Sequence, residues 1–227
     1  MTTSVASHPP VAPRRGAARA STWWGKAWVR AVEEAAYAAS DAQTARSLSR
    51  SGRIGQISID SGRFVAAVED EQGLWAVLGS VPVLDPSAAD ALVETIAAEA
   101  GRVAALLHGE LPHTLVEHAE ESGVELLPYG SELGSTCTCD FWADPCVHAL
   151  AVLHQLAWLM EADPFVLLQL RGLARDDLLA RLHERTEVVT PSDDDGDLDA
   201  ALEAALYAAL LLEETRSDEG AEGHPAQ

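Results

Sequence analysis

Residues 137–148 read CTCDFWADPCVH, and they hold all three cysteines of the 227-residue chain within ten positions. The spacing is C-x-C-x6-C-x-H, which supplies Cys137, Cys139, Cys146 and His148. Three cysteines and one histidine are a standard ligand set for a structural, tetrahedral zinc ion. Because the number of cysteines is odd and the first residues contain no apolar export signal, a disulfide framework is disfavoured. The cluster therefore predicts a zinc site.

Local geometry supports four ligands from this one segment. Cys137 and Cys139 are two residues apart, so on an extended chain their sulfur atoms lie on the same side. Asp144 and Pro145 are typical of a helix start, with Asp144 as N-cap and Pro145 at the first helical position. On an ideal helix, Cys146 and His148 would point in directions about 200° apart around the helix axis. One of them is therefore expected in the irregular turn before the helix. The alternative is a trio of small buried side chains beside an incidental histidine.

Away from the cysteines, the apolar pattern alternates between the period of helices and that of strands. Upstream it predicts helices at residues 21–36, 41–51, 88–108 and 115–122, and three strands at residues 54–59, 63–68 and 74–78. Downstream it predicts helices at residues 147–160, 164–170, 176–184 and 198–214. His154 would point away from a site that His148 faces, because six helical residues turn the chain by about 240°.

These elements predict an α+β fold, a helical body with a small antiparallel three-stranded sheet and a Cys3His zinc finger made of a short hairpin plus a helix. Five segments follow from composition and pattern. They are a disordered basic arm (1–20), a helical and β-meander region (21–132), the finger (133–160), short C-terminal helices (161–186), and an acidic linker with an amphipathic helix and a tail (187–227).

Charge limits the classes of partner. The chain carries a formal charge of −21, so its surface as a whole repels a phosphate backbone. The first 66 residues are the exception, with nine basic and four acidic residues. Arg46, Arg50, Arg53 and Arg63 are the candidates there for contact with nucleic acid, and a solvated helix face is the alternative. No apolar run is long enough to span a membrane, and a cytoplasmic protein is expected.

The cysteine pattern, with Asp140, Phe141 and Trp142 after the second cysteine and an Ala/Val/Leu-rich helix after the histidine, resembles the SWIM zinc finger. The likeness extends over residues 21–185 to actinobacterial SWIM-finger proteins. It implies a Cys3His zinc site on a short hairpin and helix, and binding to DNA or protein, often beside helicase-like ATPases of the SWI/SNF type. Many relatives carry a basic residue between the last two ligands, where this chain has Val147.

Function follows from the closed ligand set. Four protein ligands leave zinc no open position for an activated water, and the sequence contains no P-loop, GxSxG or HExxH motif. We expect a non-catalytic interaction module, with a protein partner ahead of DNA because of the acidic charge. A zinc-thiolate redox switch and an unrecognised enzyme are the alternatives. Phe141 and Trp142 are expected to pack over the zinc site instead of contacting a partner, and loss of zinc is expected to unfold residues 133–160.

Overall fold

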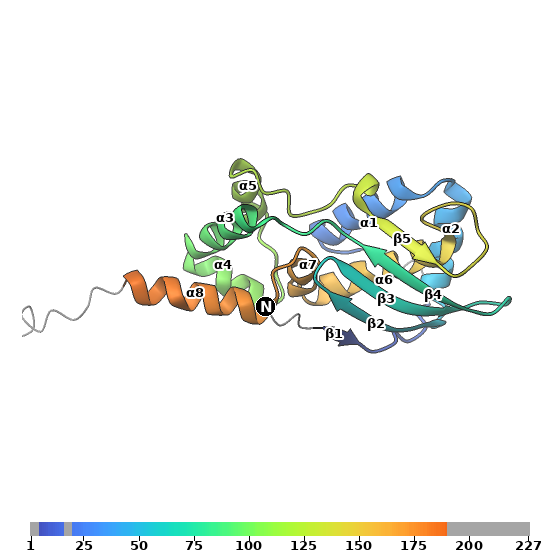
Figure 1. Ribbon diagram of the computed structural model, residues 1–227. Helices are drawn as coiled ribbons and strands as arrows, with labels where there is room; N and C mark the ends of the chain where they lie inside the picture. Colours follow the sequence, from blue (N-terminus) through green and yellow to red (C-terminus); the bar gives the residue numbers. More distant parts are fainter. Residues whose placement is uncertain (1–4, 16–19, 190–227) are drawn as a thin grey trace, which may run out of the picture. The chain divides into compact units, whose positions relative to one another are not determined.

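The computed structural model describes residues 5–15 and 20–189, and Figure 1 shows the order of their elements. Contacts divide the chain into a compact unit of residues 1–182 and a second unit of residues 183–227. Within the described ranges, no helix is both long and apolar enough to cross a membrane. The mixture of helices and one sheet confirms the predicted α+β class.

The sheet is antiparallel and has five strands in the order β1-β2-β3-β4-β5. The predicted meander forms β2 (Ile54–Asp60), β3 (Arg63–Glu69) and β4 (Leu74–Ser80). The prediction of three strands is wrong because each edge gains a short strand. β1 (Ala6–His8) lies in the arm that was expected to be disordered, and β5 (Gly134–Cys137) lies in the finger.

One face of the sheet is buried and the other is exposed, because apolar side chains alternate along the strands. Gly79 on β4 lies opposite Phe64 on β3, and both are buried. A Cβ atom built on Gly79 would lie 1.8 Å from the Phe64 ring. The phenylalanine ring therefore fills the space that a side chain at position 79 would need.

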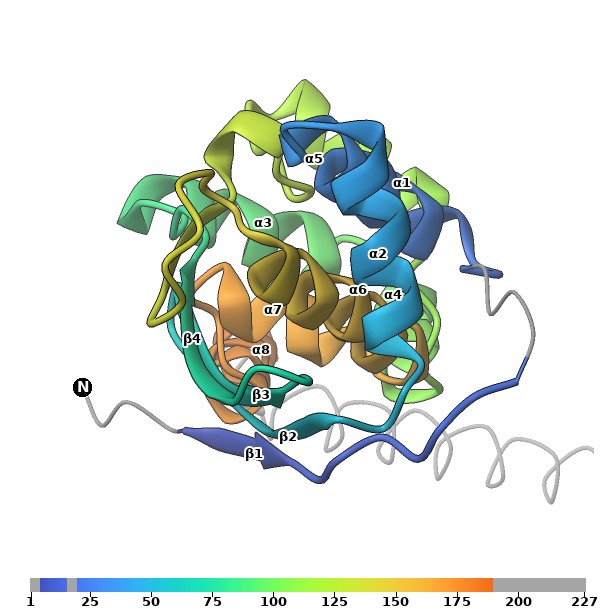
Figure 2. The same ribbon diagram turned by 90° about the vertical axis from the view of Figure 1, so that its right-hand side faces the viewer.

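Helix α6 (Val147–Ala162) is the centre of the core. Twelve of its sixteen residues are buried, as expected for a helix that is apolar around most of its circumference. Helices α1 (Trp23–Ala35) and α2 (Ala39–Ser49) pack on one side of α6, and the sheet curves around its other side (Figure 2). α1 and α2 match the helices predicted from the sequence.

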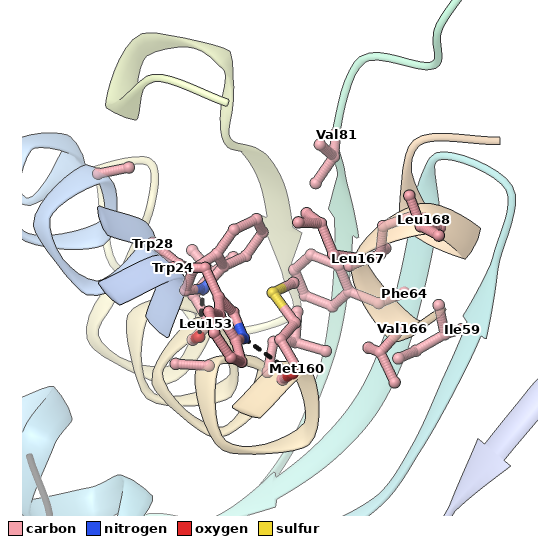
Figure 3. Packing of buried hydrophobic residues seen from close by; sticks show 14 of the residues in the cluster. Trp24, Trp28, Ile59, Phe64, Val81, Leu153, Met160, Val166, Leu167 and Leu168 are labelled. Carbon is pink, nitrogen blue, oxygen red and sulfur yellow. Dashed lines mark hydrogen bonds between the residues drawn. The ribbon is translucent and has the colours of Figure 1, made fainter. Parts of the chain in front are cut away.

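Two tryptophans of α1 fix it to α6 by hydrogen bonds as well as by packing. The Trp28 indole nitrogen donates to the Leu153 carbonyl at 2.9 Å, and that of Trp24 donates to the Met160 carbonyl at 3.1 Å (Figure 3). Both rings are buried. A buried indole normally needs such a partner, so the two bonds let large aromatic side chains fill the core without an unsatisfied donor.

The region predicted as one long helix at residues 88–108 is broken into α3 (Pro86–Ala97) and α4 (Ala100–Leu107). Glu99 between them has an extended backbone. The break places the buried Arg102 side chain against the end of α3, where it donates to the Thr95 carbonyl at 2.5 Å and pairs with Glu99 at 2.6 Å. A buried guanidinium needs such partners.

The remaining helices are α5 (His113–Glu121), α7 (Phe165–Leu170) and α8 (Arg175–Val189), with a short 3-10 turn η1 (Gly130–Glu132). α8 continues to residue 189, into the segment predicted as the acidic linker. The rest of that linker, the predicted helix at residues 198–214 and the tail lie outside the described residues.

The finger is built into the sheet and the core. Its expected hairpin is absent from residues 133–160, because β5 pairs with β4 instead of with a second strand of the finger. Cys137 lies opposite Val77 in this pairing. Thr138 continues it, since its amide donates to the Ala76 carbonyl and its hydroxyl accepts from the Ala76 amide. One side of the finger is therefore positioned by the meander.

Candidate metal centre

The four predicted ligands come from two regular elements and the loop between them. Cys137 ends β5, and Cys139 lies in the loop of residues 138–145, which we call the finger loop. Cys146 is the N-cap of α6 and His148 is the second residue of that helix. Cys146 and His148 are buried, whereas Cys137 and Cys139 are partly exposed.

The ligand atoms of the four residues all lie within 4.8 Å of one another. His148 Nδ1 is 3.8 Å from Cys137 Sγ and 4.0 Å from Cys146 Sγ. A tetrahedral zinc ion with bonds of about 2.3 Å to sulfur and about 2.0 Å to nitrogen holds its ligand atoms roughly 3.5–3.8 Å apart. The cluster therefore fits zinc as its cofactor with little adjustment.

Cys146 and His148 reach the same point because the helix starts after Cys146, at Val147, and not at Pro145. Cys146 has an extended backbone, with φ −76° and ψ 172°, and helical geometry begins at Val147. The expectation that one of the two ligands precedes the helix is confirmed. The proposed cap at Asp144 is wrong, and its carboxylate instead accepts a hydrogen bond from the Ser135 hydroxyl across the finger loop.

A second layer of contacts holds the histidine ring in place. His148 Nε2 donates to Asp70 Oδ2 at 2.9 Å, which leaves Nδ1 free to face the thiols. The Trp75 ring stacks on the imidazole with centroids 5.7 Å apart, and its indole nitrogen donates to Asp70 Oδ1. A carboxylate on the far nitrogen of a ligating histidine is the usual arrangement in metal sites, where it fixes the tautomer.

Sequence reasoning missed Asp70 and Trp75. Asp70 begins the turn between β3 and β4, where its side chain also accepts from the Gln72 and Gly73 amides. That turn role explains an aspartate by local structure alone, so the sequence showed no sign of a second partner 78 residues away. The hydrogen bond from His148, and then those from Trp75 and the two amides, lower the pKa of Asp70 below its ordinary value.

The thiols also point to a cation. Burial raises the pKa of Cys146 to about 12 and raises that of Cys137. The pKa of Cys139 is lowered because hydrogen bonds, first from the Phe141 amide and then from His148, outweigh its burial. Three sulfur atoms this close would repel one another as thiolates. A divalent ion removes that repulsion and displaces the protons, so metal binding here releases protons.

The aromatic side chains of the finger loop are not buried over the metal centre as expected, although Phe141 lines a hollow together with Cys139 and His148. Trp142 is 71% exposed and Phe141 is 44% exposed. The Trp142 ring contacts Phe141, and it also contacts Tyr37 between α1 and α2, which is 70% exposed. We call Tyr37, Phe141 and Trp142 the aromatic cluster.

The structure separates the four candidate arginines. Helix α2 ends at Ser49, so the helical face that would have aligned Arg53 with Arg46 and Arg50 does not extend that far. Arg46 and Arg50 line one cavity, and Arg53 lines a hollow beside Asp70 and His148. Arg63 is the first residue of β3, and Glu69 is the last residue of the same strand. The four arginines therefore do not line one common cavity.

The site is a closed Cys3His zinc centre that joins a strand to the start of a helix, which is the class of a structural zinc finger. Residues 123–157 match the family model of the SWIM zinc finger. The chain is also similar to the uncharacterized protein Rv2102 of Mycobacterium tuberculosis, with 31% identity over 165 residues. That alignment covers 72% of this chain and 59% of the relative's length. No solved structure matches.

Proposed function

We propose that this chain is a non-catalytic zinc-binding module whose finger loop docks on a protein partner. Cys137, Cys139, Cys146 and His148 hold the ion. Four protein ligands complete the tetrahedron, so the metal orders the loop and has no position for a reacting water. The ion supplies folding energy to a segment with few buried side chains of its own.

The aromatic cluster carries this proposal. Its three rings come from two segments about one hundred residues apart, and they contact one another while remaining exposed. Tryptophan and tyrosine are enriched among the residues that contribute most to protein interfaces, and grouped exposed aromatic side chains are typical of an interaction surface. A metal-held loop presents them with little loss of entropy on binding.

Charge favours a protein over DNA at this surface. Asp140 and Asp144 are exposed in the same loop, and Val147 replaces the basic residue found in many relatives of the finger. Carboxylates repel a phosphate backbone but attract a basic protein segment, whose arginine or lysine side chains can also pack on Trp142.

The family resemblance adds a helicase-like ATPase of the SWI/SNF type as a partner class. Reduced zinc thiolates suit a cytoplasmic location.

The test is affinity capture from cell lysate with the zinc-loaded full chain, with half of each sample treated with nuclease. Trp142→Ala is compared with Tyr129→Ala, a matched control that removes an exposed aromatic ring outside the aromatic cluster. We expect a specific protein to be retained by the wild type and by Tyr129→Ala, to be lost with Trp142→Ala, and to be unaffected by nuclease.

Zinc content and melting temperature are measured for each variant, and both should match those of the wild type.

DNA is the second candidate, through Arg46, Arg50, Arg53 and Arg63. Capture that disappears with nuclease, and that depends on Arg53 and not on Trp142, would replace the protein partner with DNA. Equal retention by Trp142→Ala and Tyr129→Ala would exclude the aromatic cluster as the docking surface.

A further inference from the structure

The cavity lined by Arg46 and Arg50 lies between α1, α2 and α6. Figure 2 shows α1 and α2 beside α6. The volume of the cavity is about 590 Å³, within the range of small-molecule sites. Its α6 wall includes His154, six residues after the ligand His148. Six helical residues correspond to a rise of about 9 Å and a large rotation around the helix. The cavity is therefore separate from the metal centre.

The walls of this cavity are strongly basic. Lys26 and Arg30 come from α1, Arg46 comes from α2, and Arg50 follows it, while Glu33 is the single acidic lining residue. Such an excess of positive charge is unusual in a chain of net charge −21. Arg14 adds a further charge next to the wall, since its guanidinium lies 4.2 Å above the ring of the lining residue Trp158.

Two of the basic side chains are already paired with acids: Arg30 with Glu34 at 2.9 Å, and Arg46 with an acid that a ligand could replace. Arg46 donates to Glu33 at 2.7 Å, and both side chains are about half exposed. An ion pair at this exposure contributes little to stability. Exchange of its carboxylate for a phosphate group would therefore cost little, and a guanidinium binds phosphate through two parallel hydrogen bonds.

His154 is the observation that points to a ligand. Its side chain lines the cavity and is only 4% exposed, yet Nε2 has no hydrogen-bond partner among the described residues. Burial, and then the charges of Arg46 and Arg50, lower the pKa of His154 to about 4. A buried polar atom without a partner is costly and uncommon. In the tautomer with the proton on Nε2, this nitrogen would donate to an oxygen atom of a bound anion and so be satisfied.

We propose that this cavity binds the phosphate group of a small phosphorylated molecule, held by Arg46, Arg50 and His154. Several arginines around one concave site suit a multiply charged phosphate better than a single carboxylate. Gln43 and Ser49 add polar groups, and Val29 and Trp158 supply apolar wall for the organic part. This site is independent of the docking role proposed for the finger loop, so either can fail alone.

The experiment is isothermal titration of the zinc-loaded full chain with pyrophosphate and with ATP, at low and at physiological salt. We expect both probes to bind, and Arg46→Met to weaken binding at least tenfold. Glu33→Gln should strengthen binding several-fold, because it removes the carboxylate that competes for Arg46. Arg175→Met, which changes an exposed arginine at the start of α8 that does not line this cavity, is the matched control and should leave the affinity unchanged.

His154→Gln keeps a hydrogen-bonding group but changes its position, and should also weaken binding at least tenfold. If this variant does not fold, the two exposed-residue variants Arg46→Met and Glu33→Gln still decide the proposal. Absence of binding by both probes would overturn it, as would equal affinities of Arg46→Met and Arg175→Met. Binding of a single-stranded oligonucleotide with no binding of either probe would also overturn it, because the phosphate would then belong to a nucleic-acid backbone.

Discussion

The finger loop and the interior of α6 are neighbours in the chain but bury very different amounts of apolar surface. In α6, Leu150, Leu153 and Leu156 have no exposed surface. In the finger loop the two largest side chains, Phe141 and Trp142, face solvent. The helix is therefore ordered by packing, whereas the loop depends on bonds to an ion. The comparison shows how a small segment can be held rigid while its aromatic side chains stay available for binding.

Removal of zinc should have the largest effect, and it should be local. Structural zinc contributes on the order of 10 kcal/mol of binding free energy in finger peptides. We expect a chelator, or Cys139→Ala, to abolish hydrogen-exchange protection in residues 134–147. The interior of α6 should stay protected because Trp24 and Trp28 still hold it. This range is shorter than the one predicted from the sequence.

Unchanged exchange in residues 134–147 after zinc is shown to be absent would contradict the contrast between loop and core. Loss of protection across the whole of α6 would instead show that the metal supports the core as well. Ser135→Ala, which removes a hydroxyl from the same region and no metal ligand, is the control for non-specific opening.

Trp28→Ala tests the other half of the comparison. The ring is fully buried and its indole bonds the Leu153 carbonyl, so truncation should lower the free energy of unfolding by about 3–5 kcal/mol. Denaturant titration measures this loss. Zinc stoichiometry should be unchanged wherever the variant is folded. Tyr37→Ala, which removes an exposed ring, should cost less than about 0.5 kcal/mol, and a similar loss from both variants would argue against the assigned core.

Acid should weaken the core through His154. The pKa of its imidazole is about 4 in the fold, below the ordinary value near 6.5, so protonation favours the unfolded chain. The contribution of the neutral His154 to the free energy of unfolding is fully present above about pH 6.5. It is lost as the pH drops towards 4, and the total loss is about 3 kcal/mol. His154→Gln should lack this component. Both proteins lose zinc in acid, so the difference between their unfolding free energies isolates the histidine, and a difference independent of pH would contradict the assignment.

Asp70→Asn should have the smallest effect, on metal affinity alone. The amide can still accept from the Trp75 indole, but it binds the His148 ring less strongly than a carboxylate does. Loss of such an outer partner typically lowers affinity 10- to 100-fold. Competition with a zinc chelator measures the change, and Glu71→Gln is the matched control. An unchanged affinity would show that Trp75 stacking alone orients the ring.

Local pattern was sufficient to predict that four potential ligands lie together, and to predict most regular elements. The ligands fall within twelve residues, and their spacing alone predicts a zinc site, whatever the rest of the fold is. The meander and α6 have clear periods over their full lengths. β1 and β5 have only three and four residues, too few for a period, and each is recognisable as a strand only once its partner strand is present.

The features that were missed depend on contacts between distant parts of the chain. The break at Glu99 accompanies the burial of the charged Arg102, which a pattern of apolar residues cannot predict. The exposure of Trp142 depends on which face of the finger loop meets the body, and its neighbour Tyr37 is far away in sequence. The cavity around His154 likewise needs three helices to be placed together before its charge becomes visible.

The ring of Phe64 above Gly79 has a consequence for sequence divergence. Any side chain at position 79 would overlap this ring, and the interior lacks room to move it aside. A larger residue at position 79 therefore requires a smaller one at position 64. A related chain with alanine at the position of Gly79 should carry a smaller residue than phenylalanine opposite it, and in this background Phe64→Leu should partly rescue Gly79→Ala.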